Sequence, residues 1–141
     1  MPKPVRTMQK ATQQRGIEMI RNPISRATPP HYSPAWAVHP IDDAAAAYAQ
    51  GDYAAELRIT RPLAAKGEAW AQFNLGVMYL NGHGVARDNV RAHMWFNLAA
   101  VRGDTDAEKN RDIAAKGMTT QQMAEAQKLA RECQARDFKG C

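Results

Sequence analysis

The sequence predicts an all-α fold, organised as a short solenoid of about three antiparallel helix pairs. Helix-forming residues are abundant along the chain, and runs in which β-branched and polar residues alternate are missing. The residues from Ala71 to Gly103 have the pattern of two short helices joined by a loop, and part of this pattern occurs once before. A two-helix unit that recurs with a period of roughly 30 to 40 residues is typical of a helical solenoid.

Residues 1–40 differ in composition from the rest of the 141-residue chain. They hold all the prolines except Pro62, and their basic side chains outnumber the single acid, Glu18, by the chain's whole net charge of +5. Prolines at this density interrupt regular structure, so we expect a poorly ordered extension with at most one short helix, over residues 8–20. A basic arm could bind nucleic acid, but no aromatic residues interleave its charges, which favours an unstructured extension or a misassigned start.

The same extension lacks the apolar segment and the small-residue cleavage site of a secretory signal. The chain also contains no apolar run long enough to cross a membrane. The compartment therefore stays open: the chain as written would be cytoplasmic, and an exported or periplasmic protein is the alternative if the start is misassigned.

The first predicted helix pair covers residues 41–66. Its first helix is rich in alanine, with Asp42 or Asp43 as the N-cap and Gly51 as the terminator, because short polar side chains satisfy the free N–H groups at a helix start. Asp52 has the same capping role for the second helix. The sequence therefore predicts two helices joined by a tight turn.

The central pair is the most regular part of the chain. Residues 71–80 place apolar side chains at helical spacing, and Gly82 suits the left-handed conformation that ends many helices. Asp88 is the predicted N-cap of the next helix, in which Trp95 and Phe96 belong to the apolar stripe. We expect these two aromatic side chains to lie in the core.

Two residues oppose helix formation inside predicted helices. Pro62 costs about 3 kcal/mol in a helix interior, so we predict a kink or an early stop there, or a separate turn over residues 62–66. Gly76 costs about 1 kcal/mol relative to alanine. Close approach of a neighbouring helix would compensate for that cost, because glycine has no side chain to keep the neighbour away.

The third predicted pair follows the central one. Its first helix begins at Asp104 or Thr105 and closes at Gly117. Thr119 and Gln122 then have the spacing of a capping box, in which each side chain bonds the backbone N–H of the other residue. The last helix runs on from this start, which completes an array of the minimum length for independent stability, about three repeats.

The central pair carries a family resemblance. It reads Ala-Gln-x-x-Leu-Gly-x-x-Tyr-x-x-Gly-x-Gly-Val-x-x-Asp, followed by Ala-x-x-Trp and Ala-Ala-x-x-Gly, and so resembles the Sel-one-like repeat, a relative of the tetratricopeptide repeat. The match is partial over residues 43–67 and weaker over residues 104–131. The resemblance implies a right-handed stack of helix pairs over residues 41–135, with residues 136–141 as a tail. It implies binding of other proteins and brings no catalytic residue with it.

The resemblance also implies where a partner would bind. In such stacks the first helix of each pair lines the inner surface, and the polar side chains expected there include Gln72, Asn74 and Arg111. These side chains could recognise a protein or an extended peptide, or they could be solvated, and Asn74 could make an internal hydrogen bond. An array of about three pairs offers a shallow groove, so we expect a non-catalytic adaptor of modest affinity.

Cys133 and Cys141 are the only cysteines in the chain. Cysteine-rich bacterial members of the resembled family bond cysteines at a similar spacing, so the resemblance implies a disulfide that ties the tail to the last helix. Two unpaired thiols are the alternative in a reducing cytosol. We expect neither a redox motif nor a metal site, because the two-residue spacing is absent and no histidine lies nearby at ligand spacing.

The sequence indicates no catalytic site and no cofactor. We expect His83 to be a solvated loop residue and His93 a helix-surface residue, and the glycines beside His83 lack the strand and the lysine of a phosphate-binding loop. One alternative function is a hydrolase acting on cell-wall or β-lactam-like compounds, as suggested for cysteine-rich relatives, although no nucleophile with an adjacent base is evident. The other alternative is a nucleic-acid tether through residues 1–40.

Overall fold

The computed structural model describes residues 39–141 of the chain. The helix predicted over residues 8–20 lies outside the described residues, as does most of the predicted extension. Within residues 39–141 the structure is helical and has no strands, so the predicted all-α repeat fold is confirmed. The helices are α2 (Pro40–Ala49), α3 (Tyr53–Ala65), α4 (Ala69–Asn81), α5 (Asn89–Val101), α6 (Thr105–Lys116) and α7 (Thr120–Ala135).

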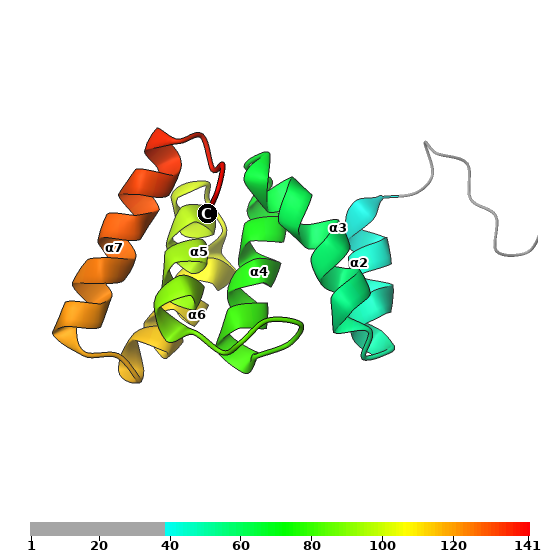
Figure 1. Ribbon diagram of the computed structural model, residues 1–141, viewed down its shortest axis with the longest axis horizontal. Coiled ribbons are helices and arrows are strands. Elements are labelled where there is room, and N and C mark those ends of the chain that lie inside the picture. The colour runs from blue at the N-terminus through cyan, green and yellow to red at the C-terminus, as the bar shows by residue number, and fades with distance from the viewer. Residues whose placement is uncertain (1–38) are drawn as a thin grey trace, which may run out of the picture. The chain divides into compact units, whose positions relative to one another are not determined.

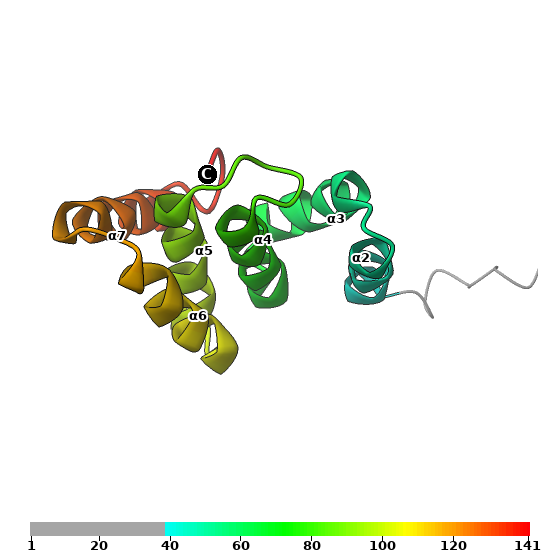
Figure 2. The ribbon, with the colours of Figure 1, turned by 90° about the horizontal axis from the view of Figure 1, so that it is seen from below.

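Helix α5 has a central place in the packing. From α2 to α6 each helix packs on the next one in the chain, but α7 packs on α5 and has little contact with α6. Figure 1 shows a row of helices with α2 at one end and α7 at the other, and Figure 2 shows α6 and α7 both next to α5. Helix α5 is therefore covered by α4, α6 and α7 together.

Four of the helices begin as the sequence predicts. The side chains of Asp52, Asp88 and Asp104 each accept a hydrogen bond from the backbone N–H three residues further on, at 3.0 to 3.1 Å. Thr119 accepts from the N–H of Gln122 at 3.1 Å, while the Gln122 side chain accepts from the N–H of Thr119 at 2.9 Å. The predicted capping box is thereby confirmed, and each cap satisfies an N–H group that has no partner within the helix.

Helix α2 begins differently from the prediction. Its N-cap is His39, whose Nδ1 accepts a hydrogen bond from the N–H of Ile41 at 3.2 Å. Pro40 occupies the first turn, where its missing N–H costs nothing because that group would have no helical partner. The predicted N-cap at Asp42 or Asp43 is wrong. Both acids lie in the first turn, where their negative charges interact favourably with the positive end of the helix dipole and stabilise the helix.

Helix α3 passes through Pro62 and ends at Ala65. The predicted early stop at Pro62, and the separate turn over residues 62–66, are therefore wrong. Pro62 is exposed and lies in the last turn of the helix, so it removes a single hydrogen bond close to an end. Its own carbonyl still accepts from the N–H of Lys66 at 3.2 Å, which closes the helix.

The core consists of a few large side chains set among alanines. Phe96 is fully buried and Trp95 is 3% exposed, so their predicted core position is confirmed. Leu75, Met78 and Leu98 fill most of the remaining volume. Small residues let the helices approach closely, and the alanines with no exposed surface are Ala44, Ala64, Ala71, Ala92, Ala99, Ala107 and Ala126. None of the helices in residues 39–141 is long and apolar enough to span a bilayer.

Candidate functional site

A hollow of about 330 Å³ lies between helices α3, α4 and α5 and the last residues of the chain. We call it the C-terminal hollow. It combines guanidinium groups with aromatic rings and contains no acidic residue in its lining. The lining residues are Arg61, Ala65, Leu75, Tyr79, Arg91, Trp95, Phe138, Gly140 and Cys141.

Helical periodicity explains how three separate helices line one hollow. Residues four positions apart lie on the same face of an α-helix, one turn above the other. Each of the three helices contributes one such pair, namely Arg61 with Ala65, Leu75 with Tyr79, and Arg91 with Trp95. The hollow therefore lies where three helix faces converge.

The two guanidinium groups of the hollow differ in their surroundings. Arg91 lies over the ring of Tyr79, at 5.8 Å from its centre, and contacts Asp88 Oδ2 at 3.6 Å. It also donates to the backbone carbonyl of Cys141 at 3.3 Å, so it joins α5 to the end of the chain. Arg61 is exposed, and no carboxylate among residues 39–141 pairs with it.

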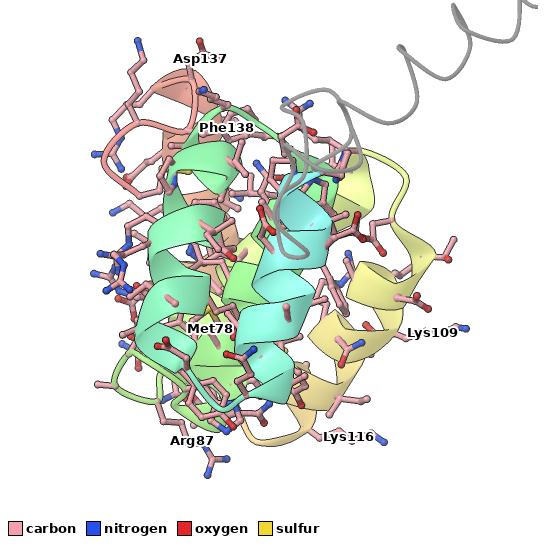
Figure 3. The ribbon with its side chains drawn as sticks, turned by 90° about the vertical axis from the view of Figure 1, so that its right-hand side faces the viewer. Met78, Arg87, Lys109, Lys116, Asp137 and Phe138 are labelled. Atoms are coloured by element: carbon pink, nitrogen blue, oxygen red, sulfur yellow. A yellow bond between two sulfur atoms is a disulfide. The ribbon has the colours of Figure 1, made fainter. Side chains whose placement is uncertain are left out.

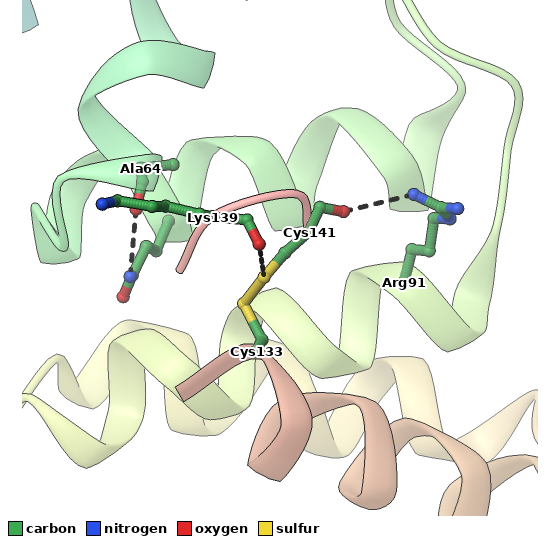
Figure 4. The surroundings of a disulfide bond; sticks show 6 residues. Ala64, Arg91, Cys133, Lys139 and Cys141 are labelled. Atoms are coloured by element: carbon green, nitrogen blue, oxygen red, sulfur yellow. Dashed lines mark hydrogen bonds between the residues drawn. A yellow bond between two sulfur atoms is a disulfide. The ribbon is translucent and has the colours of Figure 1, made fainter. Parts of the chain in front are cut away.

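The fourth wall is the segment after α7, which folds back onto the array. In the structure a disulfide joins Cys133 to Cys141, with 5.8 Å between their Cα atoms. Figure 4 shows this bond together with the contact between Cys141 and Arg91. The disulfide and the Arg91 contact therefore hold the end of the chain against α7 and α5.

Phe138 anchors the same segment. It is only 8% exposed, its N–H donates to the carbonyl of Cys133 at 2.8 Å, and the guanidinium of Arg102 lies 4.8 Å from the centre of its ring. Asp137 and Phe138 have φ angles of 56° and 64°, in the left-handed region that turns the chain back. Figure 3 shows both residues at one end of the molecule, with Arg87 at the other end.

The predicted binding residues do not line this hollow, and one of them is not at the surface. Gln72 has no exposed area, and its Nε2 donates to the carbonyl of Ala64 at 3.3 Å, so it links α4 to the end of α3. The predicted position of Gln72 on the exposed inner surface is therefore wrong. Asn74 is partly buried on α4. Arg111 donates to Asn97 Oδ1 at 3.2 Å, and a role of Asn74 or Arg111 in binding stays a prediction.

Both histidines of the central pair differ from their predicted settings. The ring of His83 is half-buried and stacks on the ring of Tyr53, with 3.9 Å between their centres. His93 is 5% exposed, so the predicted helix-surface position is wrong. Burial lowers the pKa of His93 below its ordinary value, the charge of Arg111 lowers it further, and Asp112 partly opposes both effects. Within the part of the chain that the structure describes, no three metal-binding side chains gather at one place.

Four residues that supply the guanidinium groups and aromatic rings of the hollow were not predicted from the sequence: Arg61, Arg91, Tyr79, and Phe138. The spacing of Leu75 with Tyr79, and of Arg91 with Trp95, was a usable signal, because it puts each pair on one helix face. The convergence of these faces depends on how the helices pack and on the fold of the last residues. No local pattern in the sequence carries that information.

Two other hollows lie near the loop between α4 and α5. They measure about 340 and 420 Å³, share Arg87 and Asn89, and are more open than the C-terminal hollow. Neither has an aromatic residue in its lining, and Arg87 is the only arginine of either. The C-terminal hollow is therefore the better candidate for recognition of a specific ligand.

Comparison with known proteins finds a repeat family that the central pair matches. Residues 71–104 match the Sel1 repeat, and this match covers α4 from Ala71 onward and all of α5, up to the N-cap of α6. No curated protein matches the chain.

Proposed function

We propose that this chain, a Sel1-like repeat protein, is a non-catalytic binding module that holds a segment of another protein in the C-terminal hollow. Sel1 repeats generally mediate protein–protein interaction, and the family is typically non-catalytic. The hollow lies on the matched repeat and its neighbours, since α4 and α5 supply four of its lining residues.

The observation that carries this proposal is the composition of the hollow. Arginine, tyrosine and tryptophan are enriched among the residues that contribute most to binding at protein interfaces. Arg61, Arg91, Tyr79 and Trp95 all line the hollow. Its volume of about 330 Å³ suits one or two side chains of a peptide and is small for a whole cofactor.

The walls of the hollow support binding without large rearrangement. Trp95 is packed in the core, and Phe138 is held by its contacts with Arg102 and Cys133. Walls that are fixed before binding lose little conformational entropy when a ligand arrives. We therefore expect modest but selective affinity for a short segment.

A selection of random peptides displayed on phage, with the whole chain as the target, tests the proposal. We expect enriched peptides whose binding weakens when Arg61 or Arg91 is changed to alanine. Arg131→Ala is the matched control, because Arg131 is an exposed arginine on α7 outside the hollow. Asn74→Ala tests the surface predicted from the sequence.

The outcomes separate the two surfaces. Loss of binding in Arg61→Ala with retention in Arg131→Ala and Asn74→Ala supports the hollow. Loss in Asn74→Ala with retention in Arg61→Ala would move the binding site to the surface predicted from the sequence. A selection that enriches no peptide above a library without target would count against a peptide-binding function.

A further inference from the structure

We infer that the partner segment held in the C-terminal hollow carries an aspartate or glutamate side chain next to an apolar or aromatic one. This inference rests on the proposed function and adds the chemistry of the partner. It follows from the charge of the hollow, from the identity of its apolar wall and from the charge of the segment of this chain that lies outside the structure.

The positive charge of the hollow is only partly compensated. Two arginines line it and no aspartate or glutamate side chain does, and Arg91 contacts Asp88 and an oxygen of Cys141. Asp88 contacts the guanidinium of Arg91 at 3.6 Å, whereas Arg61 has no ion-pair partner among the described residues. A guanidinium group presents its N–H donors in a planar fork that matches the two oxygens of a carboxylate. An acidic side chain would thus meet an unused donor at Arg61.

The apolar lining of the hollow indicates which kind of side chain lies next to the acidic residue of the partner segment. Leu75, Tyr79, Trp95 and Phe138 line the same hollow as the two arginines. Aromatic and aliphatic surfaces of this kind gain free energy by covering apolar side chains. Each of these four side chains is at most 8% exposed, so the apolar surface still open in the hollow is small. An apolar neighbour of the acid would cover this remaining surface, which a lone anion would leave open.

The chain's own first residues do not fit as the occupant. Residues 1–38 contain six basic side chains and the single acid Glu18. A segment of that charge would be repelled by the guanidinium groups of Arg61 and Arg91. Charge complementarity therefore assigns the hollow to a separate acidic partner.

A titration of the full chain with two small peptides tests the inference. The probes are N-acetyl-glutamyl-phenylalaninamide and its neutral counterpart N-acetyl-glutaminyl-phenylalaninamide, which differ only in the carboxylate. The readout is the nuclear magnetic resonance signal of the Trp95 indole N–H, assigned by its loss in Trp95→Phe. We expect the acidic peptide to bind about three- to tenfold more tightly, the range for a guanidinium–carboxylate pair that is partly open to solvent.

Variants at Arg61 and Arg131 test whether the preference for the acidic peptide arises in the hollow. Arg61→Gln should remove most of the difference between the two peptides, and Arg61→Lys should keep part of it, because lysine retains the charge and loses the fork. Arg131→Gln should leave the difference unchanged. Arg61 is exposed, so these variants should fold, and circular dichroism would check that they do.

Each result decides one claim. Equal affinity of the two peptides at the hollow would overturn the acidic preference and leave the peptide-binding function intact. Displacement of the acidic peptide by inorganic phosphate as readily as by acetate with an apolar tail, such as phenylacetate, would show a general anion site and also overturn it. If neither small peptide shifts Trp95 while phage-selected peptides without acids still depend on Arg61, the inference fails alone. Phage-selected peptides that bind outside the hollow would contradict the proposed function, which is peptide binding in the C-terminal hollow.

Discussion

The ring of Phe96 lies directly against the backbone of Gly76. A Cβ atom added at Gly76 would stand 2.6 Å from two ring carbons of Phe96, far inside normal contact distance. Gly76 lies in α4 and Phe96 in α5, so this contact sets how closely the two helices of the matched repeat approach. The close approach expected from the mid-helix glycine is confirmed.

Replacing Gly76 with alanine should destabilise the protein. The new methyl group would improve helix propensity by about 1 kcal/mol, but overpacking a filled core costs about 1–3 kcal/mol. We expect a net fall in the free energy of unfolding of up to about 2 kcal/mol, measured by urea denaturation. Gly117→Ala is the control, because its added Cβ would meet the side-chain amide of Asn89 at 3.3 Å and the carbonyl of Ala114 at an ordinary contact distance of 3.9 Å. Equal stability of Gly76→Ala and the wild type would show that Phe96 can move away freely.

Glu56 should limit stability at neutral pH. Its side chain is 4% exposed, its Oε2 has no hydrogen-bond partner within the described part of the chain, and burial raises the pKa of this carboxyl above 4.5. Because the carboxyl of Glu56 ionises at a higher pH in the folded state than in the unfolded state, its contribution to stability is most favourable below pH 4.5 and falls as pH rises through the folded-state pKa.

The variant Glu56→Gln removes this ionisation with little change of shape. We expect it to be more stable than the wild type at pH 7, with the difference shrinking as pH falls toward 4.5. Thermal denaturation across this pH range measures the effect. A difference that grows toward acidic pH would contradict the assignment, because it would require the folded state to favour the carboxylate.

The contribution of His93 to stability should have the opposite pH dependence to that of Glu56: it should fall as the pH falls. Its folded-state pKa lies below the unfolded value of 6.5, so the unfolded chain takes up the proton first. The stability that neutral His93 contributes is fully present above pH 6.5 and should therefore decline as pH falls toward the folded-state pKa. In His93→Gln the decline between pH 6.5 and 5 should be smaller, as urea denaturation at several pH values would measure. A decline of the same size in both proteins would assign it to other groups.

Loss of the disulfide should weaken ligand binding as well as stability. In Cys141→Ser the segment that forms one wall of the hollow loses its covalent link to α7. A loop this short contributes about 2–3 kcal/mol by the chain-entropy estimate, so we expect a fall of that order in the free energy of unfolding. Affinity for phage-selected peptides should fall too, measured by isothermal titration calorimetry. Lys139→Ser is the control, and unchanged affinity in Cys141→Ser would show that Phe138 and the Arg91 contact hold the wall without the disulfide.

Local chemistry made much of the fold predictable. Asp52, Asp88, Asp104 and Thr119 each bond a backbone N–H within their own helix start, so their roles could be inferred without knowledge of the neighbours. The start of α2 was missed because two acids near the expected boundary outweighed His39, although Pro40 was a signal for the first turn.

The buried polar residues were not predictable in the same way. Five consecutive residues of α5, from Ala92 to Phe96, are buried, because α4, α6 and α7 cover the helix from several sides. A helix surrounded in this way has no free face, so the rule that polar residues mark the solvent side fails for His93. Gln72 was missed for a related reason, since its partner is the carbonyl of Ala64 in another helix.

Because α6 and α7 rest on α5 and hardly on one another, the two should detach separately and not as a unit. Brief openings of either would leave the other in place, whereas any opening of α5 would release both at once. Backbone amides of α5 should consequently exchange their hydrogens with solvent last of all. Helix α5 is thus expected to be a common support for α4, α6 and α7, so these helices should not open as independent hairpins.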